Sequence, residues 1–116
     1  IEYYREVGKN KKAKNAILAE VKMNISYISK HEYRHIQWQI YEFFLEYLSA
    51  FKIEQIERLI IFYAKLKRHK DLGDAYRSEQ NKDPNYQNTI DGKTKRSAIE
   101  DDIKEIETIG SEIIKS

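Results

Sequence analysis

No cysteine occurs among the 116 residues of this chain, and helix-breaking residues are scarce, with one proline and four glycines. Without cysteine the chain can form neither a disulfide nor a thiolate metal site, and this absence suits a reducing compartment. Because proline and glycine are the main interruptions of helices, their scarcity favours long helices. The sequence also lacks any run of 18 apolar residues, so we expect no membrane-spanning segment within it.

Charge and length set two further bounds. The formal net charge of +2 is too small to indicate nucleic-acid binding by itself. A chain of this length has room for one domain, which can bury enough surface to fold without metal or disulfide staples. Isoleucine, leucine, lysine and glutamate are abundant and favour helix over sheet. We therefore expect residues 1–116 to form a single all-α domain.

Apolar residues recur along the chain at steps of three and four, which places them on one face of a helix. This spacing predicts four helices, at about residues 11–29, 32–48, 53–76 and 97–114. Turn-forming residues predict a loop over 77–93. Ser97 and Glu100 have the spacing of a capping box, which predicts that the last helix begins there. The expected architecture is an antiparallel helical bundle of three to four helices.

One pentapeptide, His31-Glu32-Tyr33-Arg34-His35, has the H-E-x-x-H pattern of zinc proteases. On a helix, His31 and His35 would share a face and bind one Zn²⁺, and Glu32 would act as general base toward a metal-bound water. Glu54 follows after 18 intervening residues, which is the spacing of the third metal ligand in the gluzincin metalloproteases.

The surroundings of this pentapeptide argue against catalysis. The charges of Lys30 and Arg34 favour a solvated helix face over the buried floor of an active site. No part of the sequence has the pattern of a strand that binds substrate. We therefore expect a non-enzymatic protein without a metal cofactor. A small zinc-dependent metallohydrolase that uses the pentapeptide and Glu54 is the alternative.

Basic residues gather in two stretches. These are Lys9, Lys11, Lys12 and Lys14 near the N-terminus, and Lys65, Lys67, Arg68 and Lys70 in the third predicted helix. Three roles are open for them: contact with anionic lipid headgroups, contact with nucleic-acid phosphates, or a solvated helix face. Of the two binding roles we favour lipid near the N-terminus, because Tyr3 and Tyr4 precede the first stretch. Tyrosine followed by lysine is typical of a segment that leaves a bilayer on its cytoplasmic side.

Isoleucines form the clearest apolar stripe of the last predicted helix. The residues that we expect to bind a partner are Ile99, Ile103, Ile106 and Ile113. Because this helix follows the predicted loop, its stripe could dock on its own chain, on a second copy or on another protein. The aromatic side chains around Trp38 and Phe44 are expected in the core.

The order of several features resembles that of a loose group of uncharacterised prokaryotic proteins. The matching residues are Ala16–Val21, Asn24, Trp38, Phe44-Leu45, Leu48, Ile56, Leu59 and Phe62-Tyr63. In that group a transmembrane helix precedes a helix of the form Leu-x-Glu-Ile-x-x-Asn, a short helix with Trp, and a long helix with Tyr near its middle. The resemblance covers about residues 16–70. It implies a membrane anchor upstream of Ile1 and a helical sensor or scaffold domain.

These observations together predict a non-enzymatic helical interaction or scaffold module, the soluble part of a membrane-anchored protein. We expect it in the cytoplasm at the inner face of a membrane. Nucleic-acid binding through the two basic stretches is a further alternative.

Overall fold

The computed structural model describes the backbone of residues 2–115 and the side chains of residues 8–115. Tyr3 and Tyr4, which we expected beside a bilayer, have side chains outside the described residues, and so does Ile1. The long helices are α1 (Glu2–Ser29), α3 (Ile53–Lys82) and α4 (Ile90–Lys115). Four short segments connect them: η1 (Tyr33–His35), α2 (Gln39–Phe43), η2 (Leu45–Ala50) and η3 (Pro84–Asn88). No strand occurs between residues 2 and 115, which confirms the all-α helical bundle.

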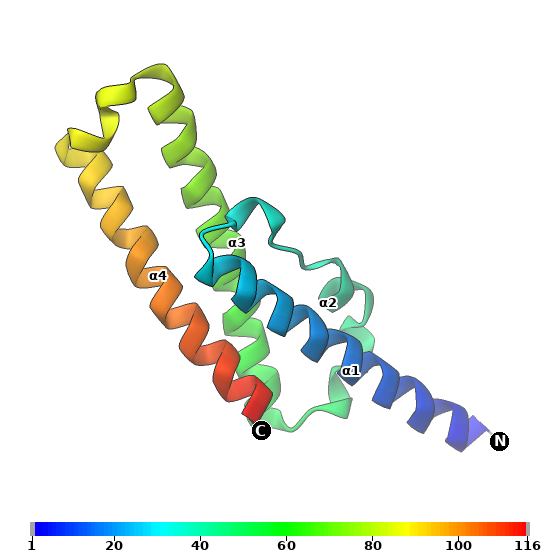
Figure 1. The fold of residues 1–116 in the computed structure, drawn as a ribbon. Helices are drawn as coiled ribbons and strands as arrows, with labels where there is room; N and C mark the ends of the chain where they lie inside the picture. Colours follow the sequence, from blue (N-terminus) through cyan, green and yellow to red (C-terminus); the bar gives the residue numbers. More distant parts are fainter. Residues whose placement is uncertain (1, 116) are drawn as a thin grey trace.

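The bundle is elongated, with principal extents of 63 × 22 × 19 Å. In Figure 1, α3 and α4 run antiparallel as a long hairpin, α1 packs against α4, and the N-terminal part of α1 extends beyond the hairpin. The short segments between α1 and α3 also pack against α1. None of the helices described over residues 2–115 is long and apolar enough to cross a bilayer.

Each long helix contributes one buried stripe to the core. The core includes Ile17, Val21 and Ile28 from α1, Leu59, Phe62, Tyr63 and Leu66 from α3, and Ile103, Ile106 and Ile113 from α4. The isoleucine stripe that we expected to bind a partner therefore packs within its own chain. Ile106 and Ile113 are fully buried, Ile103 is nearly so, and Ile99 is half-buried against the core.

The predicted continuous helix over 32–48 is not present. In its place the chain forms η1, α2 and η2, and it is non-helical at residues 36–38. The cause is tertiary: the Asn24 side chain donates to the carbonyl oxygen of Gln37 at 2.7 Å and accepts from its N–H at 2.9 Å. Because Asn24 takes both backbone groups of Gln37, that residue cannot also make helical hydrogen bonds.

The predicted loop over 77–93 was also wrong. Helix α3 continues to Lys82, and α4 already begins at Ile90. The hydroxyl oxygen of Thr89 accepts the N–H of Gly92 at 3.0 Å, so Thr89 caps the first turn of α4. A side chain on Gly92 would place Cβ 2.0 Å from the carbonyl oxygen of Tyr86, which explains the glycine at this point. The capping-box pattern of Ser97 therefore lies inside α4.

Candidate functional site

The zinc-protease pentapeptide lies at the turn after α1 rather than on one helix. His31 has a positive φ of 62°, and the next residues form the single 3₁₀ turn η1. His31 Nε2 lies 3.4 Å from Glu100 Oε1 on α4, whereas the ring of His35 contacts that of Tyr27 on α1. The two imidazoles therefore do not have the i, i+4 helical arrangement that the motif requires.

The expected third ligand is also far away. Glu54 is exposed in the first turn of α3. The ring of Tyr33, in the centre of the pentapeptide, packs against Gly73, which lies on α3 as Glu54 does. Glu54 and Gly73 are nineteen positions apart on α3, or roughly 28 Å at 1.5 Å per residue. Among the residues with described side chains, no three His, Asp or Glu groups are placed to hold a metal.

Two buried polar residues of α1 hold the segment that follows η1. Glu20 is fully buried, and its carboxylate accepts the N–H groups of Ile40 and Tyr41 at 2.9 and 3.1 Å. It also accepts the Tyr63 hydroxyl of α3 at 2.6 Å. Burial and this hydrogen bond raise the pKa of Tyr63 far above its ordinary value, so Tyr63 remains a donor.

Together with Asn24, these residues form a polar clamp, defined by Glu20, Asn24 and Tyr63. The ring of Tyr63 stacks on that of Tyr41, with centroids 4.0 Å apart and an interplanar angle of 10°. The clamp thus joins α1, α2 and α3 across the core. Its three residues are among those on which the resemblance noted in the sequence rests. Their role in this chain is to position the short segments.

A cavity of about 500 Å³ lies between η1, α3 and α4, and we call it the arginine cavity. Its basic lining residues are Arg34, Arg77, Arg96, His31 and His69, and its aromatic and aliphatic ones are Tyr33, Tyr76, Ile99 and Ile103. Gly73 also lines it: a Cβ there would lie 2.9 Å from the ring of Tyr33, so the glycine lets this ring lie flat against α3.

Cations dominate the polar lining of the arginine cavity. Arg34, Arg77 and Arg96 form no ion pair with any side chain of residues 8–115. Glu100 is the one acidic residue that lines the cavity, and it contacts His31. Three guanidinium groups without carboxylate partners form a surface suited to an anion.

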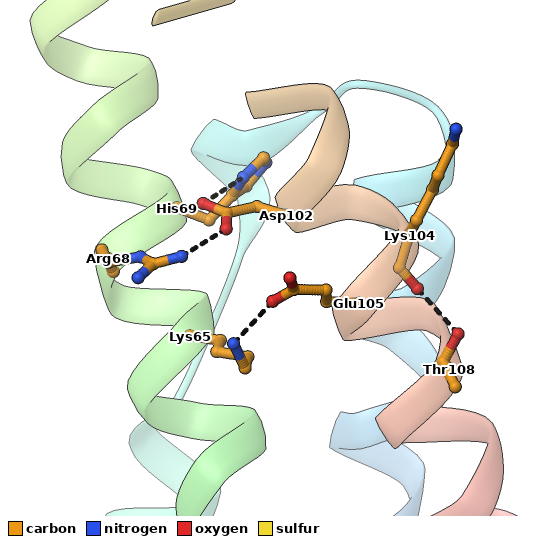
Figure 2. Close-up of polar contacts among 7 residues, drawn as sticks. All are labelled: Lys65, Arg68, His69, Asp102, Lys104, Glu105 and Thr108. Atoms are coloured by element: carbon orange, nitrogen blue, oxygen red, sulfur yellow. Dashed lines mark hydrogen bonds and ion pairs between the residues drawn. The ribbon is translucent and has the colours of Figure 1, made fainter. Parts of the chain in front are cut away.

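Unpartnered polar atoms lie in the same region. The hydroxyl of Tyr33, Nδ1 of His69 and Oδ2 of Asp102 are buried without a hydrogen-bond partner among the described residues. Figure 2 shows His69 and Asp102 facing each other between α3 and α4, at 3.9 Å. Burial lowers the pKa of His69, with the nearby Asp102 carboxylate opposing this effect. His69 is therefore neutral at physiological pH.

Three of the four residues of the basic stretch of α3 pair with carboxylates within the chain. Lys65 donates to Glu105 at 2.6 Å, and Arg68 donates to Asp102 at 2.5 Å, both across to α4 (Figure 2). The hydrogen bond from Lys65 lowers the pKa of Glu105. Lys67 pairs with Glu42 at 2.9 Å. These contacts leave little free positive charge for phosphates of a nucleic acid.

Trp38 lies beside the same stretch. Lys67 and Lys70 place their ammonium groups 5.5 and 5.3 Å from the centroid of its ring. The ring is half-buried, as is Phe44, so both lie at the edge of the core and not at its centre.

The N-terminal basic stretch is arranged differently. Lys9 and Lys12 line a surface groove of about 340 Å³ together with Phe43, Phe44 and Tyr47, and Glu46 is its one acidic residue. Phe43 is 76% exposed. Lys11 is exposed, whereas Lys14 lies 5.5 Å from the centroid of the Phe51 ring. We call this region the lysine–aromatic groove.

Sequence reasoning missed the clamp and the arginine cavity. Polar residues at core positions were the available signal. Glu20 and Asn24 fall on the stripe of Ile17, Val21 and Ile28, and His69 falls three residues after Leu66. Comparison with family models, with curated proteins and with solved structures gives no match for this chain.

Proposed function

We propose that this chain is a non-enzymatic helical interaction module that docks on an anionic membrane surface through the lysine–aromatic groove. The observation that carries this proposal is the convergence of Lys9 and Lys12 with three aromatic side chains on one surface. These groups come from segments about 30 residues apart in the sequence, and the fold brings them together.

The chemistry of the groove fits a bilayer interface. Lysines near an anionic leaflet contribute about 1 kcal/mol each to membrane binding. Tyrosine prefers the headgroup region, where one side is apolar and the other is wet, and phenylalanine inserts its apolar ring below it. Phe43 at 76% exposure and Leu45 at 46% exposure offer apolar groups for insertion beside the lysines. An anchor upstream of Ile1, as the resemblance implies, would bring this part of α1 close to the bilayer.

Two observations weigh against the alternatives. A zinc hydrolase would need His31, His35 and Glu54 at one ion, and the geometry separates them. Nucleic-acid binding would need both basic stretches free, but Lys65, Lys67 and Arg68 pair with carboxylates. Lipid binding requires only the N-terminal stretch.

Vesicle co-sedimentation tests the proposal. We expect binding to phosphatidylcholine vesicles that contain 30% phosphatidylserine and little binding to pure phosphatidylcholine. The double variant Lys9→Glu/Lys12→Glu should reduce the partition coefficient at least about tenfold, because two attractive charges become repulsive. Phe43→Ser should reduce binding while leaving the melting temperature unchanged, since the ring is mostly exposed.

A matched control separates the groove from net charge. Lys22→Glu/Lys93→Glu makes the same change in charge at two exposed lysines outside the groove. An equal loss of binding in this control would overturn the proposal. The proposal would also be overturned if the protein did not bind phosphatidylserine vesicles, or if the groove lysines bound duplex DNA or RNA instead.

A further inference from the structure

The arginine cavity is separate from the lysine–aromatic groove. It lies against η1 and the part of α3 from His69 to Asn81, whereas the groove lies at the N-terminal part of α1. Nothing in membrane docking uses its three arginines, its buried histidine or its unpartnered tyrosine. A cavity of about 500 Å³ has the size that proteins use for small organic ligands.

We propose that the arginine cavity is a binding site for a small organic phosphate, a phosphate monoester carried on a flat or apolar group. The guanidinium groups of Arg34, Arg77 and Arg96 would bind the phosphate oxygens, and Tyr76, Ile99 and Ile103 would contact the organic part. The site is built from three segments, since Arg34 follows α1, Arg77 lies on α3 and Arg96 lies on α4.

Charge distinguishes a phosphate from a carboxylate as the ligand. The three arginines of the lining outnumber its single acid, Glu100, which leaves two positive charges among these four residues. A phosphate monoester carries between about −1.5 and −2 charges near pH 7, and a carboxylate carries one. Arginine also matches phosphate geometry, because its planar fork donates two parallel hydrogen bonds.

The unpartnered polar atoms are a second reason to expect a ligand in the arginine cavity, and this reason does not depend on the arginines. Buried polar atoms in native proteins normally have partners, and exceptions call for an explanation. The Tyr33 hydroxyl and His69 Nδ1 lack partners among the described residues, and both residues line the cavity. Because the hydroxyl oxygen of Tyr33 is buried in the free protein, a ligand oxygen accepts from it when the ring shifts toward the cavity.

The aromatic and aliphatic lining explains why the ligand is organic. Inorganic phosphate would use the arginines and leave Tyr76, Ile99 and Ile103 exposed to an empty space. A ring or alkyl group attached to the phosphate would cover these side chains and bury apolar surface. The expected order of affinity is therefore phenyl phosphate above inorganic phosphate, with phenol below both.

Titration of the full chain with these three probes and with benzoate tests the proposal by ¹⁵N chemical shifts and calorimetry. We expect phenyl phosphate to shift the amides of Tyr33, Gly73 and Ile99, and to bind at least about tenfold more tightly than benzoate. Arg77→Gln and Arg96→Gln should each weaken phenyl phosphate about tenfold. Tyr33→Phe should weaken it by a smaller factor.

Lys104→Gln is the matched control. It removes one positive charge from the same helix as Arg96, and Figure 2 shows its side chain directed away from α3. It should leave the affinity for phenyl phosphate unchanged. Circular dichroism checks that each variant folds. Because Arg77 and Arg96 lie on different helices, a folding defect in one leaves the other as a test.

Several outcomes would contradict the proposal that the arginine cavity binds an organic phosphate. Equal binding of benzoate would exclude a phosphate-selective site, and equal binding of inorganic phosphate would exclude a role for the apolar lining. Shifts confined to residues outside the cavity, or an equal loss in Lys104→Gln, would show diffuse attraction to charge. The membrane variant Lys9→Glu/Lys12→Glu should bind phenyl phosphate normally, so the two proposals fail or succeed separately.

Discussion

The bundle contains two buried polar clusters, which differ in whether their polar atoms have hydrogen-bond partners. In the clamp, Glu20 and Asn24 are completely buried, and their side chains have hydrogen-bond partners on neighbouring segments. In the cluster of Tyr33, His69 and Asp102, three buried polar atoms have none among the described residues. Both clusters lie between long helices and the short segments after α1.

This difference separates a structural role from a binding role. A fully satisfied buried network fixes one arrangement of the backbone, and removing a member leaves its partners without hydrogen bonds. In an incompletely satisfied cluster, buried polar atoms lack hydrogen bonds already in the free protein, and this lowers its stability. A ligand that supplies a missing hydrogen-bond partner restores that part of the stability. We therefore expect substitutions in the clamp to damage stability, and substitutions at the cavity to damage binding while stability changes little or improves.

The largest expected effect is that of Glu20→Ala. This change leaves the N–H groups of Ile40 and Tyr41 and the hydroxyl of Tyr63 buried without an acceptor. With about 1–3 kcal/mol for each unsatisfied group, the free energy of unfolding should fall by about 3 kcal/mol or more. Urea denaturation followed by circular dichroism measures it.

Glu20→Gln is the control for this prediction. Its amide oxygen can still accept from Tyr41 and Tyr63, whereas its nitrogen faces the N–H of Ile40 and cannot accept from it. One buried donor instead of three then loses its acceptor, so the loss of stability should be smaller than for Glu20→Ala. If Glu20→Ala and the exposed substitution Glu32→Ala change the unfolding midpoint equally, the clamp has no structural role, and the contrast between the clusters disappears.

The clamp also shows how far the sequence predicts this fold. The stripes of α1, α3 and α4 were predictable, because apolar residues at steps of three and four report a buried helix face without further context. The segment after α1 was not. Its backbone conformation depends on Asn24 binding Gln37 and on Glu20 binding Ile40 and Tyr41. Hydrogen bonds across 13 to 21 residues leave no local periodicity to read.

The arginine cavity was unpredictable for a related reason. Arg34, Arg77 and Arg96 are ordinary surface residues in the sequence, spaced widely along the chain. They line one cavity because α3 continues to Lys82 and α4 begins at Ile90, which extends the hairpin past η1. The turn residues that predicted a loop instead form the compact connection Asp83–Thr89. Thr89, at the end of that connection, and Gly92, in the first turn of α4, together allow α4 to begin seven residues before Ser97.

A smaller effect of opposite sign is expected for Tyr33→Phe. The substitution removes a buried hydroxyl that has no partner, and keeps the ring that packs against Gly73. The free energy of unfolding should stay constant or rise, by about 1 kcal/mol. Urea denaturation without ligand measures this change. Tyr63→Phe makes the same chemical change at a hydroxyl that donates to Glu20, and it should lower stability.

That matched pair tests the comparison directly. Loss of stability in both variants would mean that the Tyr33 hydroxyl has a hydrogen-bond partner in the free protein. The proposed ligand site would then lose one of the two observations that support it. The opposite pattern, with gain at Tyr33 and loss at Tyr63, would confirm that the two clusters differ in hydrogen-bond satisfaction.

The smallest expected effect is a dependence of stability on pH through His69. Burial lowers the pKa of this imidazole in the folded chain, while the unfolded chain has the ordinary value of about 6.5. As pH falls below about 6.5, the unfolded state takes up a proton that the folded state does not, so stability decreases toward the folded pKa. Arg68 and His31 strengthen this effect, and Asp102 and Glu100 oppose it.

His69→Gln should flatten this dependence. We expect the free energy of unfolding of the unchanged protein to fall between pH 7 and pH 5, and that of the variant to fall less. His35→Gln makes the same substitution at an exposed imidazole and serves as the control for loss of a histidine side chain. Equal slopes in the protein and in His69→Gln would mean that His69 binds its proton as readily when folded. In that case Asp102 would already satisfy the imidazole, and the second cluster would resemble the first.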